Sequence, residues 1–295
     1  LLRRLLAPVD LDHWLGSRRM AVHLEALRLA VDKFIAQARR EMAQDHGLRE
    51  HPRNLLQALL VARDRPGSGA TDVDVSGNVF TMLLAGEDTT ANTIAWMLWF
   101  LHGHPAALRR AQDEVDRALD GAGMATSMDQ LAGMDWLQAC AHEAMRLKPV
   151  APVIMNEANE DTEVGGIQVP RGALVMCIMR PAGVRQGLVE RAGAFEPDRW
   201  LDGQGASGAY LRHASLPFGS GPRTCPGRFL ALVEVKMLVS MLLANFDIEH
   251  VRTDEGEEPA ERFTFVMAPQ GLRMRIRPKH GIAQRPAAGA EVAAF

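Results

Sequence analysis

Apolar residues recur every three or four positions over long stretches of this chain, which is the spacing of amphipathic helices. Gly and Pro clusters at residues 66–69 and 121–123 interrupt this spacing and predict loops. The predicted helices cover residues 18–42, 54–63, 72–102, 105–119, 131–147 and 229–243. Alternating positions predict a hairpin over residues 162–177 with its turn at 169–172, and strands over 246–251 and 263–277 with a turn at 268–271. We therefore expect a mainly α-helical protein with small β-sheets.

Composition adds limits on the class of protein. The chain has 295 residues, of which 47% are hydrophobic and 23% charged, and this suits a globular protein with a large core. A net charge of −3 gives no electrostatic case for nucleic-acid binding. No apolar run reaches the length of a membrane span and no signal peptide is visible, so we expect a cytoplasmic protein. Because the sequence starts at Leu1 and not at Met, an N-terminal anchor stays open.

Three cysteines are too few for a disulfide framework and suit a reducing compartment. We expect Cys140 to be a core residue of the helix over 131–147, and Cys177 a core residue of the second strand of the hairpin. Residues 279–295 are rich in Ala and Gly, and we expect them to be a disordered tail.

The loop before the last predicted helix carries the strongest chemical signal. Its sequence, over residues 216–228, is Leu-Pro-Phe-Gly-Ser-Gly-Pro-Arg-Thr-Cys-Pro-Gly-Arg. Gly and Pro exclude a regular helix or strand here and predict a tight, rigid turn. Cys225 lies where the next helix begins, and the free N–H groups and dipole of a helix N-terminus favour a thiolate over a thiol. A thiolate can be the axial ligand of heme iron, whereas the alternative is an inert buried cysteine.

The pattern Phe-Gly-x-Gly-x-Arg-x-Cys-x-Gly in this loop resembles the heme-binding signature of the cytochrome P-450 superfamily, the heme-thiolate monooxygenases. The resemblance implies heme b as cofactor, with Cys225 as the proximal iron ligand. It also implies that Arg223 pairs with a heme propionate, since a planar guanidinium suits a carboxylate. Phe218 would pack on the sulfur side of the heme, and the glycines would let the loop turn beneath it. The cofactor-binding residues implied in this way are Phe218, Gly219, Gly221, Arg223 and Gly227.

The predicted helix over 72–102 contains an unusual cluster, Ala-Gly-Glu-Asp-Thr-Thr, at residues 85–90. Glycine and β-branched threonine are poor helix formers, and threonine hydroxyls can bond back to earlier carbonyls and open a helix locally. The cluster resembles the distal helix motif of the same superfamily. The resemblance implies that Thr89 steadies dioxygen and that Asp88 relays protons to it. The alternative is a solvent-facing polar cluster on an ordinary helix.

Glu143 and Arg146 are three residues apart and can pair on one face of a helix. Together with Arg199, in the segment Phe-Glu-Pro-Asp-Arg-Trp over 195–200, they resemble the superfamily's K-helix pair and its later arginine. The resemblance implies a buried triad with a structural role. Loss of one partner from such a cluster costs about 3–5 kcal/mol, because it leaves a buried charge unpaired.

Substrate and redox contacts follow only by position from the resemblance. The implied substrate pocket is apolar and suits a lipophilic molecule, although plain core packing is the alternative for each residue. Its residues are Met82, Ala85, Ala151, Val153, Ile154 and Phe265. The sequence shows no dinucleotide or P-loop motif, so we expect electrons from a separate ferredoxin or flavoprotein reductase. Arg223, Arg228 and Lys236 are candidate docking cations for such a partner.

The resemblance covers nearly the whole chain, and it implies the cytochrome P-450 fold without its N-terminal helices. We expect residues 1–278 to be the C-terminal helical, heme-binding part of a single domain. The expected activity inserts one atom of O₂ into a lipophilic substrate. Two alternatives stay open: a non-catalytic or heme-deficient fragment, and a peroxide-using or isomerising heme-thiolate enzyme, which would not need Asp88 and Thr89.

Overall fold

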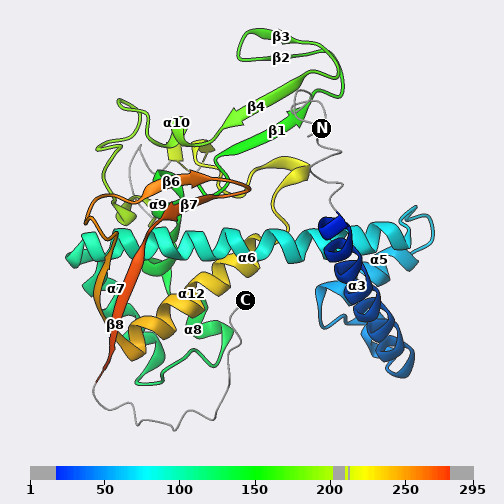
Figure 1. Ribbon diagram of the computed structural model, residues 1–295, viewed down its shortest axis with the longest axis horizontal. Helices are drawn as coiled ribbons and strands as arrows, with labels where there is room; N and C mark the ends of the chain where they lie inside the picture. Colours follow the sequence, from blue (N-terminus) through cyan, green and yellow to red (C-terminus); the bar gives the residue numbers. More distant parts are fainter. Residues whose placement is uncertain (1–17, 202–209, 212, 280–295) are drawn as a thin grey trace. The chain divides into compact units, whose positions relative to one another are not determined.

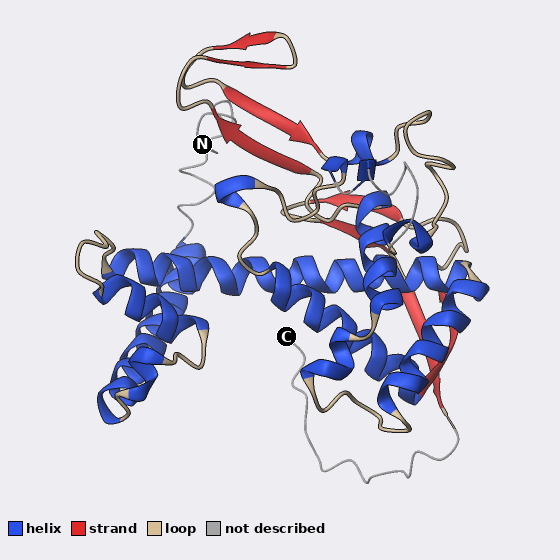
Figure 2. Cartoon of the chain, turned by 180° about the vertical axis from the view of Figure 1, so that it is seen from behind, coloured by secondary structure: helices blue, strands red, loops and turns tan. Residues whose placement is uncertain are grey.

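The computed structural model describes residues 18–201, 210, 211 and 213–279, and it divides the chain into the units Leu1–Ala85 and Gly86–Phe295. Helices dominate, and the strands form short antiparallel pairs (Figure 2). No helix among the described residues is long and apolar enough to cross a bilayer. The predicted tail over 279–295 lies outside the described residues except for Lys279, whose N–H donates to the Asn245 carbonyl at 2.9 Å.

The first unit contains α3 (Arg18–Gln44), α4 (Gly47–Glu50), α5 (Leu55–Asp64) and the first part of α6 (Asp72–Gly103) (Figure 1). Asn54 caps α5, because its side chain accepts the N–H of Gln57 at 2.9 Å. The polar break before α5 holds the one-turn helix α4, since Leu48 is buried there. The core of the unit consists of Ala38, Met42, Leu48, Leu60 and Val75.

The second unit packs four helices around one apolar core with the last part of α6. They are α7 (Pro105–Leu119), α8 (Met128–Ala132), α9 (Asp135–Leu147) and α12 (Arg228–Asn245). Helix α12 contacts α7, α8 and α9, which fits the near-continuous apolar sequence of α12. Completely buried members of this core include Met97, Leu101, Val115, Cys140, Leu137, Val239 and Leu243.

The single helix predicted over 131–147 is two helices. A capping box made by Ser127 and Gln130 starts α8, and Gly133 ends it. Helix α9 then starts against α7, where the buried carboxylate of Glu114 accepts the N–H groups of Trp136 at 2.7 Å and Leu137 at 2.9 Å. These are two of the N–H groups that a helix leaves unpaired at its first turn. Burial raises the pKa of Glu114, although both hydrogen bonds oppose that rise.

The strands pair differently from the sequence expectation. Strand β1 (Val153–Glu157) pairs with β4 (Leu174–Ile178), while β2 (Thr162–Val164) and β3 (Ile167–Val169) form the hairpin between them. A turn does lie at Arg171 and Gly172, but it joins β3 to β4, which do not pair; the predicted hairpin over 162–177 is wrong, because β2 and β3 turn at Gly165 and Gly166, with φ of 60° and 83°. Such left-handed values favour glycine.

The expectation for Cys177 is also wrong. Its partner in the strand register is Ile154, and its side chain is exposed, as are those of its neighbours Met176 and Ile178, because this end of the two-stranded sheet is uncovered. The expectation for Cys140 is confirmed, since it lies on α9 with 0% exposure.

The last four described strands do not all pair with their neighbours in the sequence. Strand β5 (Phe246–Arg252) pairs with β8 (Arg273–Pro278), and β6 (Ala260–Phe263) pairs with β7 (Met267–Gln270). The predicted turn at 268–271 is wrong, because residues 267–270 form a strand and the turn of that hairpin lies at 264–266. Short helical turns in the described part of this unit include α10 (Arg180–Gly183), η1 (Pro197–Trp200) and η2 (Gly221–Arg223).

Candidate active site

The loop before α12 folds back on itself. The N–H of Cys225 donates to the carbonyl of Phe218 at 2.8 Å, which closes the loop, and the N–H of Thr224 donates to Gly221 at 3.1 Å. Gly219 and Gly221 both have φ of 69°, in the left-handed region where a side chain would be strained. The glycines of the motif are thus needed for the turn itself.

Cys225 lies just before α12 and not within it. The helix starts at Arg228 with Gly227 at its N-cap, and the N–H of Arg228 donates to the Cys225 carbonyl at 3.3 Å. Its thiol is free and its side chain is exposed. This excludes the alternative of an inert, buried cysteine and leaves the sulfur open to a ligand.

The residues around Cys225 fit a heme. A soft sulfur donor suits iron, and an apolar ring system would cover Phe229 and Leu230, which are 78% and 55% exposed. Arg223 is exposed in the turn η2, where its guanidinium can meet a carboxylate. The donor, the apolar surface and the cation therefore match the three parts of the cofactor that the resemblance implies.

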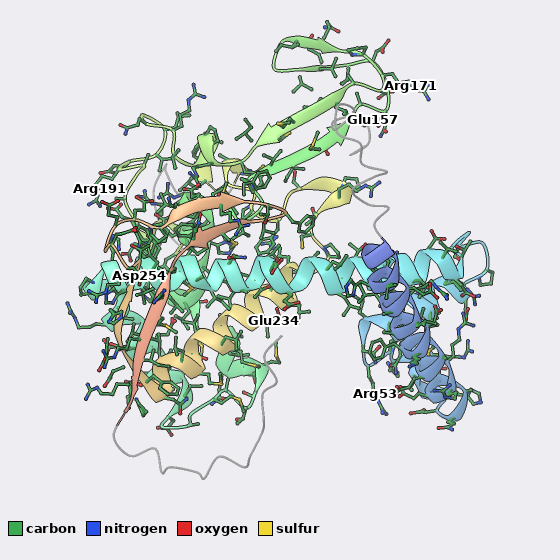
Figure 3. All side chains as sticks on the ribbon, viewed as in Figure 1. Arg53, Glu157, Arg171, Arg191, Glu234 and Asp254 are labelled. Carbon is green, nitrogen blue, oxygen red and sulfur yellow. The ribbon has the colours of Figure 1, made fainter. Side chains whose placement is uncertain are left out.

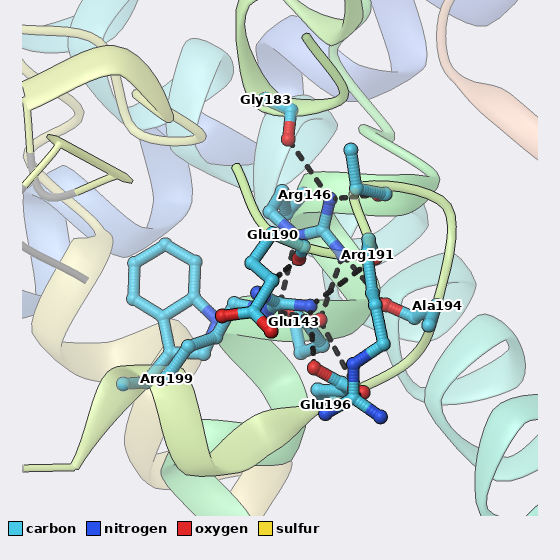
Figure 4. Close-up of polar contacts among 10 residues, drawn as sticks. Glu143, Arg146, Gly183, Glu190, Arg191, Ala194, Glu196 and Arg199 are labelled. Carbon is cyan, nitrogen blue, oxygen red and sulfur yellow. Dashed lines mark hydrogen bonds and ion pairs between the residues drawn. The ribbon is translucent and has the colours of Figure 1, made fainter. Parts of the chain in front are cut away.

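A buried ion cluster on α9 lies beside the segment that carries Arg199 (Figure 4). Arg146 forms a two-pronged pair with the carboxylate of Glu143, with Nε at 2.8 Å from Oε2 and Nη2 at 2.7 Å from Oε1. Arg199 Nε donates to Glu143 Oε1 at 3.1 Å. The structure thus brings together all three residues that the sequence analysis grouped, and their side chains are at most 7% exposed.

Backbone carbonyls take up the remaining donors of Arg146. Its Nη1 donates to the carbonyls of Gly183 at 2.8 Å and Ala192 at 2.6 Å, and its Nη2 donates to Ala194 at 2.9 Å. The Gly183 carbonyl lies at the end of the one-turn helix α10, and the other two lie in the irregular stretch that follows it. The buried cluster therefore fixes a segment that has little regular structure to hold it in place.

Sequence reasoning missed three neighbours of this cluster. The indole Nε1 of Trp200 donates to Glu143 Oε2 at 2.8 Å, and the N–H of Glu196 donates to Glu143 Oε1 at 2.8 Å. The imidazole of His142 stacks on the ring of Trp200. The only signal in the sequence was adjacency, because Trp200 follows Arg199 and His142 precedes Glu143.

The distal candidates lie on α6, which is helical at every residue from Asp72 to Gly103, so the predicted opening does not interrupt it. Asp88 is exposed and Thr89 is half-buried. Asn92 Nδ2 donates to the Asp88 carbonyl and Thr93 Oγ1 donates to the Thr89 carbonyl, both at 2.8 Å.

The pocket candidates are placed in part. A Cβ on Gly219 would lie 3.8 Å from Ile154 Cδ1, so β1 runs beside the cysteine loop. Ala151 and Val153 are half-buried, and Phe265 is 72% exposed in the turn between β6 and β7. The other two, Met82 and Ala85, belong to the first unit, and their part in a pocket stays a prediction.

Two of the candidate docking cations differ in exposure. Arg228 is exposed, whereas Lys236 is 6% exposed and its Nζ lies 3.2 Å from Gln138 Oε1. Lys236 is therefore wrong as a docking cation, because α12 turns it toward α9. Burial also lowers its pKa.

Comparisons with known proteins agree with this arrangement. A family model described as Cytochrome P450 matches residues 4–276. The cyclooctat-9-en-7-ol 5-monooxygenase of Streptomyces melanosporofaciens is 31% identical over 253 residues, and the pentalenene oxygenase of Streptomyces avermitilis is 29% identical over 277 residues. A self-sufficient cytochrome P450 monooxygenase of Oidiodendron maius is 33% identical over 239 residues.

The chain spans only part of these relatives. The three alignments cover 84%, 93% and 80% of this chain and 53%, 57% and 22% of the respective relatives. A crystal structure of a cytochrome P450 (CYP102L1) superposes with a TM-score of 0.74 at 27% identity, over 92% of this chain and 60% of that one.

Proposed function

The chain belongs to the cytochrome P450 family and has its fold, and on that premise we propose that the protein is a heme-thiolate monooxygenase. It would insert one atom of O₂ into a lipophilic substrate and reduce the other atom to water. One observation carries the proposal: an exposed, free thiol, Cys225, stands on a closed glycine loop that bears the family's complete heme signature.

The proposed cofactor is heme b. Cys225 would bind its iron, Arg223 would pair with a propionate, and Phe218 would lie on the sulfur side, while Gly219, Gly221 and Gly227 keep the backbone close. The heme would supply the activation of O₂. We propose that the Glu143 cluster contributes indirectly, because it holds the segment over 183–200 in place.

The residues Asp88 and Thr89 would deliver protons. Conversion of a substrate C–H bond to C–OH with O₂ consumes two electrons and two protons and releases one water. A carboxylate and a hydroxyl on one helix can pass protons inward one at a time, provided that bulk water stays out. Asn92 and Thr93 support this role, because side-chain bonds to the Asp88 and Thr89 carbonyls compete with the backbone bonds of the helix and can loosen it at these two residues.

The substrate would be lipophilic, with Ala151, Val153, Ile154 and Phe265 along the pocket, whereas Met82 and Ala85 of the first unit stay expectations from the resemblance. The names of two relatives point to a hydrocarbon and a cyclic alcohol, so pentalenene is a suitable probe. Electrons would come from a separate ferredoxin or flavoprotein reductase, with Arg228 as an exposed docking cation. The relative named self-sufficient illustrates the other possibility in the family, in which no separate electron donor protein is needed.

The test compares electron use with product. The heme-loaded chain is given a ferredoxin, its reductase, NADPH and pentalenene, and both NADPH loss and oxidised product are measured. We expect Thr89→Ala to lower product per NADPH about tenfold or more, since a proton-transfer group contributes on the order of 10²–10⁴ in rate. Thr81→Ala, an exposed threonine on the same helix, is the matched control.

Unchanged coupling in Thr89→Ala would refute the oxygen-activation role. If the wild type formed product only when peroxide replaced NADPH and O₂, the peroxide-using alternative would hold instead.

A further inference from the structure

We infer that His142 is a positioning residue that joins the buried Glu143 cluster to the cysteine loop. It would hold the ring of Phe218 in place, and through the Phe218 carbonyl it would hold the backbone N–H of Cys225. The inference rests on the proposed function only for its effect on heme binding. The role of His142 in holding the loop does not depend on heme binding.

The contacts form an unbroken series from the ion cluster to the cysteine. Trp200 donates its indole N–H to Glu143 at 2.8 Å, and its ring stacks on His142 with 5.2 Å between centroids and 26° between planes. His142 then meets Phe218 edge to face, at 6.5 Å and 86°. The Phe218 carbonyl accepts the N–H of Cys225 at 2.8 Å. Both ring geometries are the offset and T-shaped arrangements that aromatic pairs prefer.

The loop depends on such side-chain contacts. The backbone hydrogen bonds described for it join Phe218 with Cys225, Gly221 with Thr224, Leu216 with Gly219, Cys225 with Arg228, and Gly227 with Ala231 of α12, so none of these bonds joins the loop to α9. They fix its shape but not its position on α9. His142 projects from α9 beside the rigid Glu143–Arg146 pair, and its contact with Phe218 therefore supplies an anchor that the backbone does not.

The surroundings of His142 favour the neutral form of its imidazole. Burial is the main cause that lowers the pKa of His142 to about 4, and the positive charges of Arg228 and Lys236 contribute to the same lowering. A neutral ring can lie between two aromatic rings without the cost of desolvating a charge. The Arg228 guanidinium lies 5.9 Å from the centroid of the Phe218 ring, so a cation contacts Phe218 in addition to the imidazole.

Amide hydrogen exchange of the heme-free chain tests directly whether His142 holds the loop. We expect His142→Ala to raise the exchange rate of the Cys225 amide about tenfold or more, while the Glu196 amide, which donates to Glu143, exchanges as in the wild type. His142→Phe keeps a neutral ring and should restore slow exchange at Cys225. His46→Ala, an exposed histidine in the first unit, is the control.

The inference is overturned if the Cys225 amide exchanges at the wild-type rate in His142→Ala, or if both amides accelerate equally. If His142→Ala does not fold, His142→Gln takes its place, because it removes the ring and keeps a similar volume. The exchange rates of the Cys225 and Glu196 amides are then compared in that variant. With heme bound, His142→Ala should release it to an apomyoglobin scavenger several-fold faster than His142→Phe. If no variant binds heme, the proposed function fails, whereas the exchange comparison still decides the role of His142.

Discussion

Replacing the carboxylate of Glu143 by an amide tests the buried ion cluster with a change of very few atoms. Glu143→Gln keeps the volume and shape of the side chain and removes its charge. The carboxylate accepts five hydrogen bonds from protein donors. Two of these reach Oε2, from Arg146 Nε and Trp200 Nε1, and three reach Oε1.

The geometry sets the size of the effect. A glutamine presents one oxygen and one NH₂ group, so either orientation turns a donor toward at least two donors that it cannot satisfy. Glu143 is 0% exposed, and water therefore cannot take the place of the lost acceptor. Arg146 and Arg199 would also lose the carboxylate that they share. Breaking a buried pair of this kind costs about 3–5 kcal/mol.

Urea unfolding followed by circular dichroism measures this cost. The control is Glu157→Gln, at the exposed end of β1 (Figure 3), which should change the free energy of unfolding by less than about 0.5 kcal/mol. If Glu143→Gln lowered the free energy of unfolding by less than about 1 kcal/mol, the reasoning from buried donors would be refuted.

Three further changes probe the neighbourhood. Gly183→Ala places a Cβ 3.0 Å from Arg146 Cγ, and the ion cluster prevents Arg146 from moving away. Thermal unfolding should therefore show a free energy of unfolding that is lower by about 1–3 kcal/mol. The control Gly193→Ala, which has open space at its Cβ, should be nearly neutral. Glu114→Gln leaves one N–H at the start of α9 without its acceptor and should cost about 1–3 kcal/mol in urea unfolding; a neutral result would contradict the capping role. The His142 pKa is about 4 in the folded chain against 6.5 for a free imidazole, so the unfolded chain binds the extra proton. The free energy of unfolding should therefore fall by at most roughly 3 kcal/mol as pH drops from about 6.5 to about 4, and His142→Phe should remove that part of the pH dependence.

Helices and motif residues were predictable because their signals are local. The helix over residues 105–119 matches α7 at both ends, where Pro105 supplies the start and Asp120 the left-handed stop. The pairing of Glu143 with Arg146 follows from helical spacing, and the resemblance added Arg199.

Strand partners and most site neighbours depend on the folded chain and could not be read from the sequence. β1 pairs with β4 across an inserted hairpin, and that choice exposes Cys177. The cap that Glu114 gives to α9 joins residues 22 and 23 positions apart. The ring series from Trp200 through His142 to Phe218 joins three segments that are separate in the sequence, and no spacing within any one of them predicts these contacts.

The absorption spectrum of the heme-loaded chain, reduced and exposed to carbon monoxide, tests the central claim most directly. If Cys225 binds the iron as a thiolate, the wild type shows a strongly red-shifted Soret band, and Cys225→Ala loses it. No bound heme, or an unshifted band in the wild type, would contradict the account.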